Sequence, residues 1–402
     1  MAEEADVVIL GAGPAGLSAA VALRRAGIGR VVVLDRAPEA GGVPRFCGHS
    51  PYGLREFRRL MRGPAYARRL AAEARDAGAE IRTGTTATAL HEGPAVSVTS
   101  DEGTAWIAAR LVLLATGTRE TTRAGRLIGG TKPGGVMTTG ALQGFVYGEG
   151  LRPFRRPVIL GTELVAFSAV LTCRHAGIRP VAMVEEAPRV TARFPAALLP
   201  RMLGIPLLLT TRLLAIEGHD RVEGVVVEGP AGERRLEADG LIVTGRFRPE
   251  ATLVRESHLA LDPDTGGPEI DEYGRTSDPA VFAAGNLLRP VETAGWCWEE
   301  GRRVGAAMAA ALQGGLPAPA TRRIAHAGPI RYAVPQRYAG GAHPAFDSLQ
   351  LRAEGPCRGR LSLRTDGHEI AGRSGAFLPE RRLLLPLPPD GGAPSVAIES
   401  PT

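Results

Sequence analysis

Cysteine is scarce in this sequence of 402 residues, and its four copies are scattered at Cys47, Cys173, Cys297 and Cys357 without a CxxC pair. This spacing argues against a disulfide framework, a zinc site and an iron–sulfur cluster ligated by the chain itself. No apolar run approaches the ~20 residues that a membrane span needs. The sequence enters a predicted strand at its start, so we expect no secretory signal. A reducing cytoplasm is the expected location.

Lysine is nearly absent, because Lys132 is the single lysine and the other basic residues are arginines. The net charge is +6, but the arginines are spread along the chain without a long block. Nucleic-acid-binding proteins usually show a clustered basic footprint, so we interpret these arginines as a solvated surface. An anionic substrate or an acidic partner protein stays compatible with this charge. The length predicts two or three domains.

A glycine-rich turn follows the first apolar segment, in VVILGAGPAG. Residues 7–10 predict a buried parallel strand. Gly11 permits a tight turn, Gly13 removes the side chain that would block a pyrophosphate, and Gly16 lets the next helix pack closely. The helix start then offers free N–H groups to phosphates. Asp35 stands 24 positions after Gly11, where its carboxylate can accept the hydroxyls of an adenosine ribose. The segment therefore predicts a dinucleotide-binding βαβ unit.

A second copy of this pattern, PVILGTELVA, places Gly161 and Glu185 24 positions apart. Glu163 stands where the second glycine belongs, and its carboxylate would occupy and repel a pyrophosphate unless it turns away or is protonated. Ala166 at the third position is tolerable. Glu185 and Glu186 disfavour a 2′-phosphate, so the site favours NAD(H) or another adenine nucleotide over NADPH. The alternative is a remnant fold with no physiological hydride donor.

Further strands and one long helix are predicted between and after these units. Residues 54–78 form a basic helical region, and residues 79–117 hold strands, a hairpin and the buried segment LVLLATG. TSDPAVFAAGN at 276–286 predicts another strand-to-loop step before a helix that ends near residue 313. Proline and glycine near 315–320 mark a boundary. Alternation in SLQLRAE and RGRLSLRTDG, with Asp366–Gly367 as a tight turn, predicts a small β-domain.

GAGPAG, LLATG and TSDPAVFAAGN, in that order, resemble the motifs of the FAD/NAD(P)-binding oxidoreductases of the disulfide-reductase and thioredoxin-reductase group. The resemblance spans about residues 5–315. It implies an α/β fold with two Rossmann-like dinucleotide-binding domains and a small C-terminal β-domain. The FAD-binding domain, residues 1–120 and 245–318, would be split by a linker and second nucleotide domain at 121–244. Residues 319–402 would form the β-domain.

The same resemblance implies the cofactor contacts. FAD would lie at the first unit, with Thr116 and Gly117 at the crossover to the second domain. Asn286 stands where the family usually has an aspartate that bonds the ribityl chain, and its amide can still bond a hydroxyl. The implied FAD-binding residues are Gly11, Gly13, Pro14, Ala15, Gly16, Asp35, Arg36, Gly42, Val43, Arg45, Ala87, Thr116, Gly117, Gly285, Asn286 and Ala294. The second nucleotide site would comprise Gly161, Thr162, Glu163 and Glu185.

A narrower resemblance lies in GGVPRFCGHSPYGLREFRRLMRGPAYARRL, GTRETTRAGRLIGGTKPGGVMTTGALQ and GWCWEEGRRVG. These segments are similar to the FAD subunits of hydrogen cyanide synthase, opine oxidase and the multi-subunit proline and hydroxyproline dehydrogenases. The resemblance implies oxidation of a C–N bond in an amine or amino acid. It also implies a second flavoprotein subunit with the amine site and often a small [2Fe–2S] protein. Residues 320–402 hold one cysteine, so any cluster must come from a partner.

The redox disulfide of the thioredoxin-reductase relatives is missing. GVMTTGALQ occupies the corresponding region, with Thr138 and Thr139 and no thiol. Dithiol–flavin exchange needs two cysteines. The chain is therefore not expected to reduce thioredoxin, glutathione or lipoamide.

Side chains between Arg45 and His49 are expected beside the flavin, because they follow the first unit's GG turn. Arg45 could bind a substrate carboxylate or offset a reduced flavin's charge, or it could pair with a nearby acid. Cys47 is a weak candidate nucleophile, since most lone cysteines are small buried hydrophobes. His49 suits proton transfer, although a structural role is the stronger interpretation. The segment Trp296–Trp298 could wall the flavin ring, form a partner interface or simply pack.

Three functional hypotheses follow. The first is the FAD subunit of a hetero-oligomeric amine or amino-acid dehydrogenase. The second is a subunit whose nucleotides serve structure or electron transfer, with the chemistry on a partner. The third is a stand-alone NAD(P)H-dependent flavin reductase, against which Glu163 argues. We favour the first, in which the cofactor carries the chemistry and the protein supplies position and electrostatics.

Overall fold

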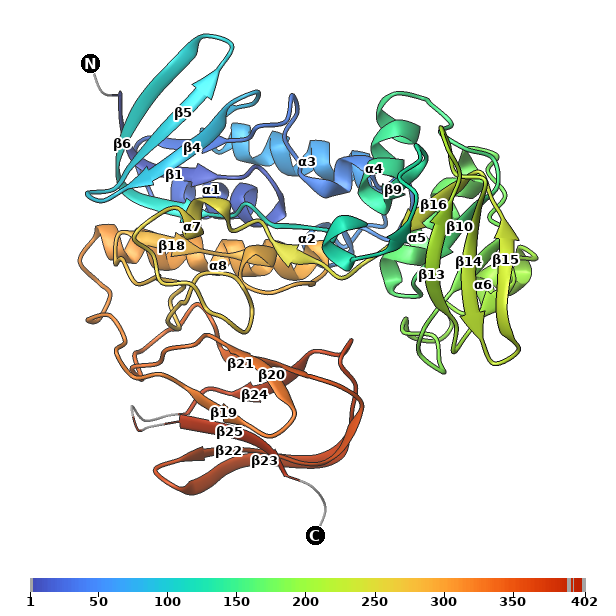
Figure 1. Cartoon of the computed structure of the whole chain (residues 1–402). Coiled ribbons are helices and arrows are strands. Elements are labelled where there is room, and N and C mark those ends of the chain that lie inside the picture. Colours follow the sequence, from blue (N-terminus) through green and yellow to red (C-terminus); the bar gives the residue numbers. More distant parts are fainter. Residues whose placement is uncertain (1–2, 389–391, 393, 400–402) are drawn as a thin grey trace.

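The computed structural model describes residues 3–388, 392 and 394–399. Figure 1 shows three neighbouring parts. The first part is a sheet with its covering helices, and it includes the first βαβ unit and the late helix α8 (Ala294–Leu312). The second unit lies beside the first part, and a C-terminal β-region lies below. The chain leaves the first part after β7 (Thr118–Arg119) and returns to it after β17 (Arg248–Pro249). The mixed α/β fold predicted from the two βαβ patterns is confirmed.

The first sheet has seven strands in the order β3-β2-β1-β6-β5-β4, with β18 also paired to β6. Strands β3, β2, β1, β6 and β18 run parallel, whereas β5 and β4 form the antiparallel end. The predicted hairpin arm and the strand LVLLATG are one continuous strand, β6. The bounds are β1 Glu3–Leu10, β2 Val31–Leu34, β3 Glu80–Arg82, β4 Thr86–His91, β5 Ala95–Ser100, β6 Gly103–Leu114 and β18 Val281–Ala283.

Helices α1 (Pro14–Arg25), α3 (Gly63–Asp76) and α8 (Ala294–Leu312) pack together beside this sheet (Figure 1). Helix α1 begins with proline at its first turn, where a missing N–H costs nothing. Helix α8 approaches α1 through Gly301 and Gly305. A Cβ on Gly305 would lie 2.7 Å from the Ala19 carbonyl oxygen, so this close packing requires glycine.

The second unit contains a five-stranded sheet in the order β12-β11-β10-β16-β9 and a four-stranded sheet in the order β15-β14-β13-β8. Helix α5 (Leu164–His175) follows β10, as α1 follows β1. The linker before the second βαβ unit also forms the short helix α4 (Thr139–Gln143). The strands are β8 Gly129–Gly130, β9 Val136–Thr138, β10 Pro157–Leu160, β11 Ala182–Val184, β12 Leu207–Leu208, β13 Arg212–Glu217, β14 Gly224–Gly229, β15 Gly232–Glu237 and β16 Gly240–Val243.

The C-terminal region pairs a four-stranded sheet, β19-β25-β22-β23, with a three-stranded sheet, β20-β21-β24, around its own apolar core. Asp366 and Gly367 have φ angles of 51° and 86° at the hairpin turn between β22 and β23. This left-handed pair is the geometry that an Asp–Gly turn favours. The strands are β19 Ala325–Ala327, β20 Ile330–Val334, β21 Ser348–Ala353, β22 Cys357–Thr365, β23 His368–Phe377, β24 Leu383–Pro386 and β25 Pro394–Glu399.

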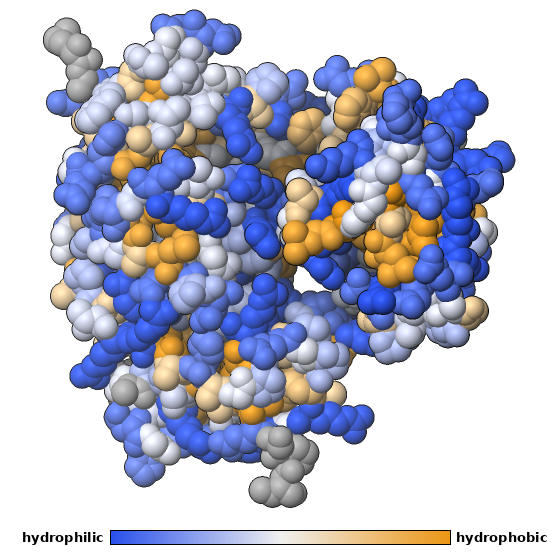
Figure 2. Space-filling model, in the orientation of Figure 1, coloured by the Kyte–Doolittle hydropathy of each residue, from blue (hydrophilic) through white to orange (hydrophobic). Residues whose placement is uncertain are grey.

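No helix in the described part of the chain has both the length and the apolar character needed to cross a bilayer. On the face in Figure 2, a hollow separates the second unit from the rest of the molecule, with apolar residues along part of its edge. The remaining elements are α2 Leu54–Phe57, α6 Leu198–Met202, α7 Thr252–Arg255, β7 Thr118–Arg119, β17 Arg248–Pro249, the 3₁₀ turns η1 Val43–Phe46, η2 Ala124–Arg126 and η4 Gly285–Leu287, and the π-turn η3 Gly144–Gly148.

Candidate functional site

The three glycines of the first turn have different surroundings. Gly11 has a φ of 113°, and a Cβ there would overlap the backbone carbonyl of Ala115. A Cβ on Gly16 would overlap the carbonyl oxygen of Gly11. Gly13 differs, because a Cβ there would meet no atom within 4 Å. Gly11 and Gly16 are therefore required by the protein's own packing, whereas Gly13 faces open space beside the helix start.

The start of α1 leaves backbone N–H groups without a side-chain partner. Gly13 caps α1 without any side-chain hydrogen bond, and the first turn of the helix carries no acidic residue. Its free N–H groups and the positive end of the helix dipole therefore remain available to a phosphate. The Asp35 carboxylate, at the end of β2, accepts hydrogen bonds of 2.9 Å from the Ala12 and Ala37 amides. These bonds hold the carboxylate beside the turn.

Two further glycines, from other parts of the chain, approach the turn at residues 11–16. We call the surface formed by this turn and these two glycines the cradle. Gly42 has a φ of 63°, and its Cβ would lie 2.9 Å from the Gly13 Cα. Gly285 has a φ of 79°, and its Cβ would lie 2.9 Å from the Ala15 Cβ. The turns at 42 and 285 therefore approach the first unit at distances that only glycine allows.

A buried ion pair holds the Gly285 turn in place. The Glu300 carboxylate of α8 accepts a 2.6 Å hydrogen bond from the Gly285 amide and bonds of 2.5 and 3.1 Å from the Arg289 guanidinium. Arg289 is 1% exposed and also donates to the Gln350 amide oxygen in β21 at 2.6 Å. The C-terminal β-region thus supports the residues that approach the cradle. Sequence reasoning missed this cluster, because nothing in the local pattern marks Arg289 as buried.

The remaining residues that the family resemblance implies as FAD contacts lie in several elements of the chain. The Thr116 hydroxyl donates a 2.8 Å bond to the Glu250 carbonyl, and Gly117 has a φ of 75°, so both form the crossover between the two units. Arg36 is largely exposed, with a guanidinium nitrogen 4.0 Å from the Glu250 carboxylate. Pro14 begins α1, Val43 is exposed in η1, Ala87 lies in β4 and Ala294 begins α8.

Asn286 uses its side chain inside its own loop. Its Oδ1 accepts a 2.6 Å hydrogen bond from the Glu292 amide, and its Nδ2 donates a 3.0 Å bond to the Glu292 carbonyl. The expected contact from Asn286 to a ribityl hydroxyl therefore has to share an amide that already holds the loop before α8. This difference follows from hydrogen bonds within the loop, between residues six positions apart, that the sequence pattern did not show.

Arg45, Cys47 and His49 lie at and after the turn η1. Arg45 donates a 3.2 Å bond to the Gly42 carbonyl and lies 4.8 Å from the Phe46 ring centre. No carboxylate in the described part of the chain pairs with it, so its guanidinium keeps donors for an anion. His49 contacts the Ser168 hydroxyl of α5 through Nε2, and burial lowers its pKa. His49 therefore joins the first part to the second unit as a neutral imidazole.

Cys47 is buried, with its sulfur 3.7 Å from the Gln143 amide oxygen of α4. Burial raises the pKa of this thiol, so it stays protonated and a poor nucleophile near neutral pH. Burial also raises the pKa of Cys173 and Cys297 to about 12. Cys357 is the half-buried member of the set. The packing therefore favours a structural role for Cys47.

We expect a thiol reagent at about pH 8 to label Cys357 first and Cys47 at least about tenfold more slowly than in guanidinium-unfolded protein. Labelled peptides can be quantified by mass spectrometry over time. The unfolded protein is the control, because all four cysteines should then react. Rapid labelling of Cys47 in the folded protein would contradict the structural role and restore it as a candidate nucleophile.

Trp296 stands at the start of α8 between two arginines. The guanidinium carbons of Arg55 and Arg382 each lie 3.7 Å from the centre of its ring system. Arg55 belongs to α2 and Arg382 precedes β24, so the indole links the helical layer to the C-terminal β-region. The Trp298 carbonyl accepts a 2.7 Å bond from Ser18 of α1. Both tryptophans therefore take part in packing between elements.

The acid after the second strand accepts similar hydrogen bonds in the two units. The Glu185 carboxylate accepts hydrogen bonds from the Ala187 amide at 3.0 Å and from the Thr162 hydroxyl. In the first unit Asp35 likewise accepts from the amide two residues later, Ala37, but its other donor is the Ala12 backbone amide and not a hydroxyl. The two acids, at equal spacing from their first glycines, are thus placed alike.

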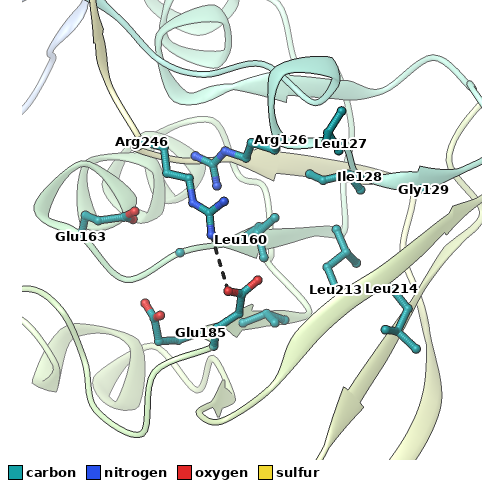
Figure 3. Close-up of a pocket in the computed structure, with 13 residues that line it drawn as sticks. Arg126, Leu127, Ile128, Gly129, Leu160, Glu163, Glu185, Leu213, Leu214 and Arg246 are labelled. Carbon is teal, nitrogen blue, oxygen red and sulfur yellow. Dashed lines mark hydrogen bonds and ion pairs between the residues drawn. The ribbon is translucent and has the colours of Figure 1, made fainter. Parts of the chain in front are cut away.

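The turn after β10 differs from the turn after β1, because the Glu163 side chain lies over it (Figure 3). A cavity of about 160 Å³ remains beside it, bordered by acidic, basic and apolar groups. The Arg126 guanidinium donates to the Thr244 carbonyl, and Arg246 lies 3.5 Å from the Glu186 carboxylate. The cavity is lined by Arg126, Leu127, Ile128, Gly129, Leu160, Gly161, Glu163, Val184, Glu185, Glu186, Leu213, Leu214 and Arg246. Arg126 ends the 3₁₀ turn η2 and Arg246 follows β16, so both lie outside the motif, which alone did not reveal them.

Comparison with known proteins gives the same picture of the fold. The chain resembles the T. acidophilum thioredoxin reductase structure with a TM-score of 0.66 and 23% identity, over 77% of this chain and 99% of that one. It also resembles L-proline dehydrogenase from P. horikoshii with a TM-score of 0.59 and 19% identity, over 78% of this chain and 57% of that one.

Among curated proteins, the chain is 30% identical to an opine oxidase subunit of Rhizobium meliloti (strain 1021), over 64% of this chain and 56% of that protein. It is 26% identical to the alpha subunit of sarcosine oxidase from the same strain, over 72% of this chain and 28% of that protein. The chain thus matches little more than half the length of the opine oxidase relative. The model of the pyridine nucleotide-disulphide oxidoreductases matches residues 5–314. The chain belongs to this family and is an FAD-dependent oxidoreductase.

Proposed function

We propose that this chain is the FAD-bearing subunit of a hetero-oligomeric dehydrogenase that oxidises an amine or amino acid of the opine, proline or hydroxyproline type. The observation that best supports the FAD site is the open space at Gly13. A Cβ at Gly11 or Gly16, on either side of it, would instead overlap the protein's own backbone. The first unit's residues fit FAD: free N–H groups for its pyrophosphate and the Asp35 carboxylate for its adenosine ribose. Bound there, FAD would supply the redox chemistry.

The amine class is supported by the two curated relatives, which are named as subunits of opine oxidase and of sarcosine oxidase. Because both names describe subunits, they also support a partner, expected to be a second flavoprotein with the amine site. Any [2Fe–2S] cluster would come from a further small protein. We propose that the FAD-binding domain comprises residues 1–120 and 245–318, and that the protein acts in the cytoplasm.

The segment that corresponds to the family's redox disulfide carries threonine hydroxyls in place of thiols, which argues against dithiol chemistry. The Thr138 hydroxyl accepts a 3.3 Å hydrogen bond from the Ala141 amide and so caps α4. Thr139 is buried beside it. Hydroxyls cannot exchange electrons with a flavin as a dithiol does. Electrons must therefore reach or leave the flavin through a substrate, a partner or another carrier.

We propose no role for a dinucleotide at the second unit, although its sequence favours NAD(H) or another adenine nucleotide. Glu163 lies where the pyrophosphate would approach the turn. No step of the proposed function therefore passes through this site. A stand-alone NAD(P)H-dependent reductase is correspondingly disfavoured.

The first experiment is an anaerobic titration of the purified yellow chain, followed by flavin absorbance. Proline, hydroxyproline, glycine, sarcosine and an opine are added separately, and NADH and NADPH are the comparison. Bleaching by an amino acid supports a dehydrogenase that is complete in this chain. Bleaching only after a second flavoprotein is added supports the proposed division of labour. Rapid bleaching by NADH would overturn it in favour of a pyridine-nucleotide reductase.

A further inference from the structure

The residue that caps the helix after the turn differs between the two units. Gly13 caps α1 with extended backbone angles, φ −85° and ψ −175°. Glu163 caps α5 with similar extended angles, φ −67° and ψ 167°. The two positions are therefore equivalent in the fold. In the first unit the position opens onto free space, whereas in the second it carries a carboxyl side chain.

The Glu163 side chain turns back over its own turn. A Cβ on Gly161 would overlap Oε2 of Glu163, and a Cβ on Gly245 would lie 2.6 Å from its carboxyl carbon. These glycines belong to the turn after β10 and to the end of β16. The carboxyl group therefore fills the corner where a dinucleotide brings its phosphates closest to the backbone.

Hydrogen bonds hold the carboxyl group in this corner. The Thr244 hydroxyl oxygen lies 2.9 Å from Oε2 of Glu163 and 2.9 Å from the Leu160 carbonyl oxygen. A hydroxyl has one proton, so Thr244 satisfies both contacts when it donates to Leu160 and accepts from a protonated Glu163. Burial raises the pKa of Glu163, which favours this protonated form. The group then blocks the corner chiefly by its volume.

We propose that the Glu163 side chain is a built-in occupant of the phosphate position, so that the second unit excludes NAD(H) and other dinucleotides. Glu185 keeps its ribose-binding placement, and the obstruction is therefore confined to the turn. Given the proposed FAD site, the flavin of this chain does not receive hydride from a pyridine nucleotide. Its electrons come from the oxidation of the substrate, directly or through a partner.

The test is calorimetric titration of the FAD-loaded protein with NADH. We compare the native sequence with Glu163→Gly, Glu163→Gln and Glu186→Gln. Glycine is well tolerated at a helix N-cap, so Glu163→Gly should fold normally. Glutamine keeps the volume of Glu163. Glu186→Gln removes a carboxylate from the same cavity but away from the turn. Circular dichroism and flavin content check the fold of each variant.

We expect no saturable NADH binding by the native protein, Glu163→Gln or Glu186→Gln. Glu163→Gly should gain at least about tenfold in affinity, because room for the phosphates is restored. Tight NADH binding by the native protein would overturn the proposal, as would failure of Glu163→Gly to bind NADH. Equal binding by Glu163→Gln and Glu163→Gly would overturn the volume argument. The proposed FAD site fails separately, if the purified chain lacks flavin.

Discussion

Replacing Gly13 with glutamate should yield soluble, folded protein without FAD. The Cβ of the new side chain meets no atom within 4 Å, and the backbone at this position is extended, so the fold can accept it. The carboxylate would stand where the pyrophosphate approaches the turn. Like charges brought together in a binding site cost several kcal/mol, which predicts an affinity for FAD at least about 100-fold weaker. Flavin absorbance per chain and titration of the apoprotein with FAD measure the loss.

A matched control for this change is Gly375→Glu in β23. A Cβ there also meets no atom within 4 Å, but the residue lies on the exposed C-terminal hairpin. This variant should keep its FAD. Stoichiometric FAD in Gly13→Glu would show that the cofactor does not lie against this turn. The substitution gives the first unit the residue that Glu163 supplies to the second, so both experiments ask whether a carboxyl side chain at this position keeps a dinucleotide out, by charge in the first unit and by volume in the second.

Replacing Arg289 with methionine should destabilise the protein by about 3–5 kcal/mol, because Glu300 would be left as a buried and unpaired charge. Glu300 is 7% exposed, and Arg289 is the partner that neutralises it. The loss should appear as a lower urea midpoint by circular dichroism with an unchanged slope. FAD should also dissociate more readily. Arg289 positions the Glu300 carboxylate, which in turn accepts the 2.6 Å hydrogen bond from the Gly285 amide.

The control on the same helix is Arg302→Met. Arg302 pairs with Glu299 at 2.7 Å but is about half exposed, so its removal should cost less than about 1 kcal/mol. The double substitution of Arg289→Met with Glu300→Gln should recover stability, because an amide oxygen can still accept from Gly285 without a buried charge. Equal stability of Arg289→Met and Arg302→Met would refute the importance of the buried pair.

Local pattern was sufficient for the repeated elements. Both βαβ units, the continuation into α8 and the Asp366–Gly367 hairpin follow from strand, turn and helix signals within short windows of sequence. Glycine spacing also marked the first turn as a nucleotide cradle. Such signals are local because the turn geometry and the helix start depend mainly on residues adjacent in the chain.

Long-range contacts were outside the reach of that reasoning. His49 contacts Ser168 across two units, and Arg289 reaches Gln350 in the C-terminal β-region. Polar side chains follow no sequence periodicity that would identify their partners. Which polar groups meet depends on how the helices and strands pack in the folded protein. Buried polar groups must nevertheless find such partners, so the packing decides which arginines and carboxylates become structural.

The sequence by itself determined that this chain carries two nucleotide-type units, no redox dithiol and an anomalous Glu163 at the second turn. It left open whether that carboxyl group turns away from the phosphate position. Only the tertiary structure decided this, by bringing Thr244 of the neighbouring strand end within 2.9 Å of the carboxyl oxygen. A side chain's direction depends on the partner that satisfies it, and here that partner lies 81 residues away in the sequence.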